Sequence, residues 1–147
     1  MSTRLRLTVF ALFLFLTACA DKTALRENQQ KWVAQNVSHY RFEVEIGCNC
    51  PWYALMPLKV EVKNGEVISM TDKDGQPIPA NYAETFNKAA SIEKLFAILD
   101  SAIGSASEVN VEYNPDYGYP TKIGIIYSKM TTDNGIGYYV KNFEVLK

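Results

Sequence analysis

The sequence predicts an α+β domain, in which an antiparallel sheet of about six strands packs against two helices. Several short runs alternate apolar with charged residues, as strands do when one face is buried and the other is wet. Asn64-Gly65 joins two of these runs, and Asn-Gly is the strongest short signal for a β-hairpin. The order of helix, three strands, helix and three strands predicts two helix-plus-three-strand-meander units.

The N-terminal segment predicts a secretory signal peptide ahead of this domain. Arg4 and Arg6 precede an apolar run over residues 7–16, which only Thr8 interrupts. A helix of that length reaches about 15 Å, roughly half of the hydrocarbon thickness of a bilayer, so it is too short to span one. A positive segment followed by a short apolar run is instead typical of a signal peptide.

The apolar run ends at Leu16-Thr17-Ala18-Cys19, which resembles the lipobox of bacterial lipoproteins. The resemblance implies cleavage before Cys19 and lipid on that cysteine, whose acyl chains would make the membrane a partner. It divides the chain into a lipoprotein signal peptide (residues 1–18), a lipidated tether (19–23) and a single α+β domain (24–147). Because Ala20 rather than aspartate follows, it also implies the outer membrane, facing the periplasm. The alternative is an ordinary signal peptide with a chance cysteine.

Residues 20–36 predict the first helix, which follows the short tether and which Thr23 would cap. Leu25, Trp32 and Val33 would form its thin apolar stripe.

The strand signals begin at residues 40–46, where apolar and charged side chains alternate until Gly47 ends the run. Residues 58–63 alternate in the same way, and Asn64-Gly65 turns the chain into a third run at residues 67–70. A type I′ turn needs positive φ at both central positions, which this pair favours. The glycine and prolines after residue 74 then predict a loop.

Residues 91–103 predict the second helix, because apolar side chains recur on one face at helical spacing. Ser91 is the expected N-cap, Glu93 suits the first turn, and Gly104 would close the end. Three more alternating runs follow, near residues 109–113, 123–127 and 137–145. In the last run one face is expected to carry Tyr139, Lys141, Phe143 and Val145.

Several short motifs together resemble a family of bacterial proteins catalogued as domain of unknown function 6174. The motifs are Tyr40-Arg41-Phe42, Cys48-x-Cys50-Pro51, Val60-x-Val62 with Asn64-Gly65, a helix from Ile92 to Leu99, and Val111-x-Tyr113 leading to Tyr117-Gly118-Tyr119-Pro120. The resemblance covers roughly residues 30–147. It implies a secreted or lipid-anchored protein and carries over no activity.

Cys48 and Cys50 are the only thiols left if Cys19 carries lipid, and they would face an oxidising compartment. One interpretation is a tight disulfide, whose short loop would contribute little entropic stabilisation. Such a ring would be strained and easily reduced, so a redox-active pair is the second interpretation. A soft metal ion held by two thiolates, or a pair of free buried thiols, are the others. A structural zinc site would need more ligands, and the one histidine, His39, is expected to be a solvated loop residue.

The loop over residues 114–120 carries a possible binding surface, formed by Tyr113, Asp116, Tyr117 and Tyr119. Amphipathic rings suit recognition because they bury area and keep a polar group. In the structural interpretation, which the prolines and glycine of the loop favour, these rings pack over a sheet edge instead.

Composition narrows the classes of function. Without residues 1–18 the chain has 13 basic and 16 acidic residues, a net charge of −3. The sequence contains no basic stripe, which argues against nucleic acid as a partner. With a single histidine and neither a Gly-x-Ser-x-Gly motif nor a phosphate loop, we expect no enzyme, no catalytic residue, no metal site and no cofactor.

The sequence therefore favours a lipid-anchored, periplasm-facing protein of the cell envelope, most simply a non-catalytic binding or accessory module. Its contact surface would be the curved sheet and the loop from Tyr113 to Pro120 at the sheet edge, and its partner would be an envelope protein or a small molecule. The alternative function is thiol–disulfide or metal handling by Cys48 and Cys50.

Overall fold

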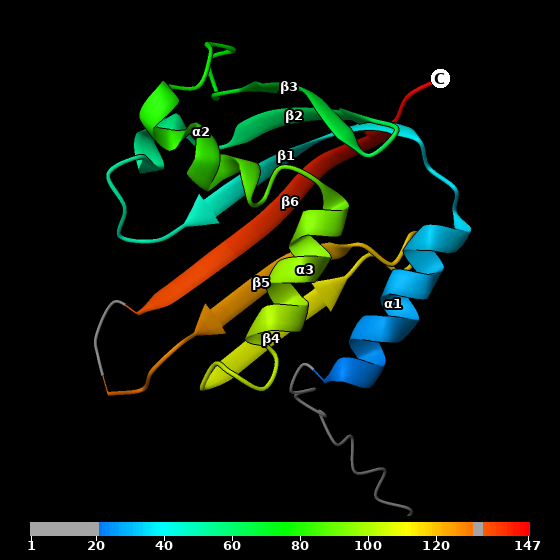
Figure 1. Cartoon of the computed structure of the whole chain (residues 1–147), viewed down its shortest axis with the longest axis vertical. Coiled ribbons are helices and arrows are strands. Elements are labelled where there is room, and N and C mark those ends of the chain that lie inside the picture. The colour runs from blue at the N-terminus through cyan, green and yellow to red at the C-terminus, as the bar shows by residue number, and fades with distance from the viewer. Residues whose placement is uncertain (1–20, 131–133) are drawn as a thin grey trace, which may run out of the picture.

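The computed structural model describes residues 21–130 and 134–147. The predicted signal peptide and Cys19 lie outside these described residues. The elements in chain order (Figure 1) are α1 (Lys22–Ala34), β1 (His39–Gly47), the short helix η1 (Tyr53–Leu55), β2 (Leu58–Lys63), β3 (Glu66–Thr71), α2 (Ala80–Asn87), α3 (Ile92–Ala102), β4 (Glu108–Tyr113), β5 (Pro120–Ile126) and β6 (Gly135–Val145).

The strands form one six-stranded sheet in the order β3-β2-β1-β6-β5-β4, and every neighbouring pair is antiparallel. The predicted α+β class is confirmed. Each half of the sheet is a three-strand meander that follows a helix, and the halves join through β1 and β6 at the centre. The first strand of one unit therefore lies beside the last strand of the other.

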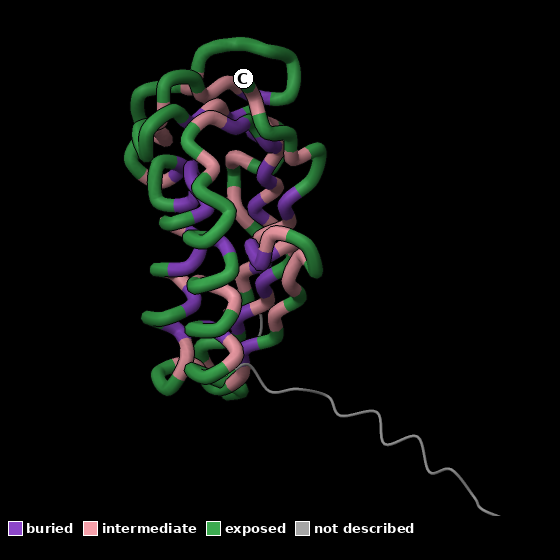
Figure 2. The backbone as a smooth tube through the Cα atoms, turned by 90° about the vertical axis from the view of Figure 1, so that its right-hand side faces the viewer, coloured by how far each residue is buried: buried purple, intermediate pink, exposed green. Residues whose placement is uncertain are grey.

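The helices and the sheet enclose a single hydrophobic core. Figure 1 shows α2 and α3 in front of the sheet, and the buried residues in Figure 2 gather between helices and strands. The inward side chains of β1 are all buried, namely Tyr40, Phe42, Val44 and Ile46. Burying such side chains is the main favourable contribution to folding, at about 25 cal/mol for each Å² of apolar surface. The charged side chains between them face the opposite, outer side of the sheet.

The first helix begins one residue after Asp21, not at the predicted cap Thr23. Asp21 has an extended backbone (φ −122°, ψ 162°), and its carboxylate accepts a hydrogen bond of 2.7 Å from the Ala24 amide. A carboxylate at this position satisfies a free amide and suits the positive end of the helix dipole. Only one side of α1 faces the core, so Trp32 is buried and Val33, predicted to share its stripe, is 74% exposed.

Local signals located the β2–β3 hairpin and α3 correctly. Asn64 and Gly65 both have positive φ (51° and 79°), as the predicted turn requires. The Ser91 side chain caps α3 by accepting from the Lys94 amide at 3.2 Å, and Gly104 follows the helix with φ +93°. The predicted face of α3 is buried at Ile92, Leu95, Phe96 and Leu99.

Two further features depart from the prediction. The segment expected as a loop contains a third helix, α2, which Pro79 precedes and which buries Phe86. Strand β6 does not alternate regularly, because Asn142 and Phe143 together lie opposite Phe42 in a β-bulge, with φ +51° at Asn142. The bulge turns Phe143 into the core, whereas Lys141 pairs with Glu45 on the outer face.

Candidate functional site

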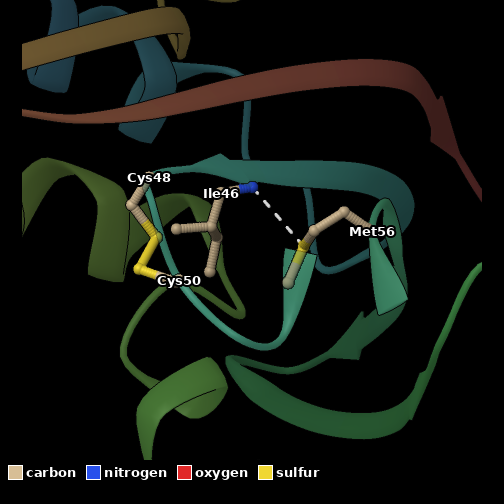
Figure 3. Close-up of a disulfide and its surroundings, with 4 residues drawn as sticks. All are labelled: Ile46, Cys48, Cys50 and Met56. Carbon is tan, nitrogen blue, oxygen red and sulfur yellow. Dashed lines mark hydrogen bonds between the residues drawn. A yellow bond between two sulfur atoms is a disulfide. The ribbon is translucent and has the colours of Figure 1, made fainter. Parts of the chain in front are cut away.

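Cys48 and Cys50 lie directly after β1 at disulfide distance. Their sulfur atoms are 1.96 Å apart and their Cα atoms are 5.2 Å apart. Figure 3 shows the pair beside Ile46, whose amide donates to the Met56 sulfur at 3.5 Å. The loop between β1 and β2 is thus held at its start by the cysteine pair and at its end by Met56.

The surroundings of the cysteine pair bear on redox chemistry. A reactive thiol needs a nearby cation or hydrogen-bond donor that lowers its pKa. Within the described residues, no hydrogen bond or ion pair involves either sulfur, and Cys48 packs against the hydrophobic core. The single histidine, His39, sits at the opposite end of β1.

The loop over residues 114–120 is folded onto α1. The Asn114 side chain accepts from the amides of Asp116 (3.0 Å) and Tyr117 (2.8 Å), which closes the loop as an Asx turn. Helix α1 and its C-cap residue hold the loop from outside: Lys31 of the helix donates to the Pro115 carbonyl, and the C-cap Gln35 donates to the Asp116 carbonyl at 3.1 Å.

The tyrosine rings of this loop point inward. They join an aromatic cluster, which we define as Trp32, Tyr40, Phe42, Tyr117, Tyr119 and Phe143. The Tyr119 ring centre lies 4.5 Å from that of Phe143, and Tyr119 is only 6% exposed. Tyr113 is half-buried. Its burial is the main reason that the pKa of its hydroxyl is raised to about 12. Of the residues predicted as a recognition surface, only Asp116 is exposed, so these rings are placed for packing.

Glu93 connects the aromatic cluster to α3, a role that sequence reasoning missed. Its carboxylate accepts from Trp32 Nε1 at 2.9 Å and from the Tyr40 hydroxyl at 3.0 Å. The Tyr40 oxygen accepts in turn from the Ile92 amide at 3.1 Å. Burial, the largest cause, raises the pKa of Tyr40 far above its ordinary value, with Glu93 adding to the shift. The network joins three elements that are distant in sequence, so no local pattern could reveal it.

The outer face of the sheet contains a hollow of about 360 Å³, which we call the outer hollow. Charged and polar side chains of β1, β2, β3 and β6 line it, namely Arg41, Glu43, Lys59, Glu61, Ser69, Thr71, Asn142 and Glu144. Its position was not predictable from the sequence, because it depends on the order of the strands and on the bulge in β6.

Most charges of the outer hollow are held by partners. Two nitrogens of Arg41 donate to Glu144 Oε2 at 2.9 and 2.6 Å, and Asn142 donates to Glu43 at 2.8 Å. Lys59, Ser69 and Thr71 differ, because within the described residues their side chains have no hydrogen bond or ion pair. Thr71 lies opposite Lys59 in the strand register, so a cation and hydroxyl groups stand unpaired on neighbouring strands.

His39 borders this face and is not the solvated loop residue that was predicted. It is the first residue of β1, its side chain is 18% exposed, and its Nε2 lies 2.7 Å from Glu61 Oε1. The antiparallel pairing of β1 with β2 brings these side chains together. The residues around His39 in the sequence do not indicate this contact.

Residues 21–130 and 134–147 contain no group of three His, Cys, Asp or Glu side chains that could hold a metal ion. Among the described helices, none has the length and apolar character needed to cross a bilayer.

Comparison with known proteins gives one match. The model of the family described as "Family of unknown function (DUF6174)" matches residues 24–145, which is nearly all of the described chain. No match was found among curated proteins or among solved structures.

Proposed function

The chain belongs to the DUF6174 family, and we propose that it is a lipid-anchored protein of the cell envelope that binds a partner protein through the outer hollow. Cys19 would carry the lipid and hold the domain at the outer membrane, facing the periplasm. The domain would act as a non-catalytic binding module. The single observation that carries this proposal is that, in the described part of the chain, the helices cover one face of the sheet and leave the hollowed, charge-lined face uncovered.

The size and charge of the outer hollow favour a protein over an enclosed small molecule. A volume of about 360 Å³ is at the lower end of ligand pockets, and it suits one protruding side chain. The pairs Arg41–Glu144 and Asn142–Glu43 hold fixed charges around it, and fixed complementary charges give interfaces their specificity. Among the described residues, the side chains of Lys59, Ser69 and Thr71 have no partner, so they offer a cation and two hydroxyl donors that suit a carboxylate.

The cysteine pair has a structural role in this proposal. Cys48 and Cys50 close a loop that packs on the core, and within the described residues neither sulfur has a hydrogen bond or ion pair of the kind that activates a thiol. We therefore assign no thiol–disulfide exchange to them.

Crosslinking in cells tests the contact surface. A photoreactive residue at Ser69 of the full chain is expected to give a discrete crosslinked protein, because Ser69 lines the outer hollow. The same residue at Gln30, exposed on α1, is the control and is expected to give none. Lys59→Glu should reduce the Ser69 adduct at least about fivefold, since it places a like charge against the partner carboxylate. Equal adducts from both positions, or an adduct indifferent to Lys59→Glu, would show that the outer hollow is not the contact surface.

Fractionation tests the anchor. The full chain is expected in the membrane fraction and should incorporate an alkyne-labelled fatty acid, whereas Cys19→Ser should lose the label and leave that fraction. Val33→Ala, a change at an exposed position, serves as the matched control. An unlabelled wild-type chain, or a Cys19→Ser variant still bound to membranes, would contradict lipidation at Cys19.

A further inference from the structure

A second concavity lies on the opposite side of the sheet and belongs to no site described above. It runs between α2, α3 and the β5–β6 hairpin and has a volume of about 530 Å³, within the range of small-molecule sites. We call it the inner groove. Figure 1 shows the elements concerned: α3 crosses in front of the sheet, and the neighbouring ends of β5 and β6 lie to its left.

The body of the inner groove is mostly apolar. Ala97, Ile98 and Ser101 of α3 line it together with Tyr127 and Tyr138. Tyr127 is 51% exposed. Burial, the largest cause, and the neighbouring Tyr127 raise the pKa of Tyr138 to about 12, so its hydroxyl stays protonated and can donate. An apolar body with a few donors is typical of a site for an amphipathic ligand.

The rim of the groove is positive on balance. Lys88 and Lys94 line it together with one acid, Glu84. Lys94 donates to Asn87 Oδ1 at 2.6 Å, which fixes its position at the rim. Within the described residues Lys88 has no ion-pair or hydrogen-bond partner for its side chain, so its charge is available to a ligand.

From this juxtaposition we propose that the inner groove binds a free single-chain amphiphile, with its apolar chain along Tyr127 and Tyr138 and its anionic head at Lys88 and Lys94. The apolar walls would bury the chain, which is the main source of affinity for such a ligand. The excess of positive charge selects an anionic head over a neutral or cationic one. This site is independent of the outer hollow, because the two lie on opposite faces of the sheet.

Photolabelling of the full chain in nanodiscs of zwitterionic lipid tests the proposal. Three decyl probes carry the same diazirine and end in a carboxylate, an alcohol or a trimethylammonium group. The carboxylate is expected to label peptides that contain Tyr127, Tyr138 or the Ala97 turn of α3, at least about fivefold more than the other two. Acetate in excess should not compete, because it has a head group without a chain.

Variants make the result specific to the groove. Lys88→Glu, at an exposed position, should lower carboxylate labelling about fivefold and raise labelling by the ammonium probe. Ala97→Trp should block labelling by all three probes, because its ring would fill the groove. Ala34→Trp is the control: Ala34 is exposed and lines a different shallow groove on α1, so this change should leave labelling by all three probes as it is.

Equal labelling by the alcohol and carboxylate probes would overturn the proposal of an anionic head. Unchanged labelling of Ala97→Trp would overturn the groove, and loss of labelling in nanodiscs of anionic lipid would assign it to bilayer lipid instead.

Discussion

Replacing Trp32 by alanine is expected to lower the free energy of unfolding by about 3–5 kcal/mol. Trp32 is 4% exposed, and its ring packs edge-on against Tyr40 (5.4 Å), Phe143 (5.8 Å) and Tyr119 (6.2 Å). Removing the ring would leave a cavity where α1 meets the sheet. It would also deprive the Glu93 carboxylate of the indole donor at 2.9 Å. Denaturant unfolding of the purified protein measures the loss.

Two variants separate packing from hydrogen bonding in this prediction. Trp32→Phe keeps an aromatic ring but loses the donor to Glu93, so we expect a loss of about 1–2 kcal/mol. Val33→Ala, one residue further along α1 and 74% exposed, should stay within about 0.5 kcal/mol of the wild type. A Trp32→Ala variant no less stable than Val33→Ala would mean that α1 does not pack on the core as described.

The sequence reveals the parts of this fold that depend on neighbouring residues and misses those that depend on distant ones. Asn64-Gly65 and the Ser91 cap act over a few residues, so turn and capping chemistry located the β2–β3 hairpin and the start of α3. Helix α2 was missed because prolines introduce it, and prolines are also typical of loops. The bulge at Asn142 depends on how β6 meets β1, a contact between the two ends of the chain.

The candidate sites were harder to predict than the fold, because they too depend on contacts between residues that are distant in sequence. The proximity of Cys48 and Cys50 follows from their spacing alone, whereas the direction of the Tyr117 and Tyr119 rings follows from the docking of their loop on α1. The outer hollow and the inner groove each combine residues from three or more elements. Their chemistry is visible in the sequence as scattered lysines, glutamates and tyrosines, and only the strand order brings these side chains together.

The docking of the loop over residues 114–120 on α1 can be tested at Gly118. Gly118→Ala is expected to destabilise the protein by about 3 kcal/mol or more, because two costs add at this position. Its φ of +82° disfavours any residue with a Cβ, at about 1–2 kcal/mol. An added Cβ would also lie 2.7 Å from the Asn28 carbonyl oxygen and 2.9 Å from Lys31 Cβ, so α1 or the loop would have to shift. Unfolding in denaturant measures the effect.

Gly75→Ala is the matched control, because Gly75 has nearly the same φ, +77°, and an added Cβ there would meet no atom within 4 Å. It should show the conformational cost alone, about 1–2 kcal/mol. The difference between the two variants then reports the close approach of the loop to α1. If Gly118→Ala and Gly75→Ala were equally stable, the loop would not be held against α1, and Tyr117 and Tyr119 would be free to face a partner. The comparison of Gly118→Ala with Gly75→Ala therefore tests whether these tyrosines belong to the core, as their packing indicates, or to a recognition surface.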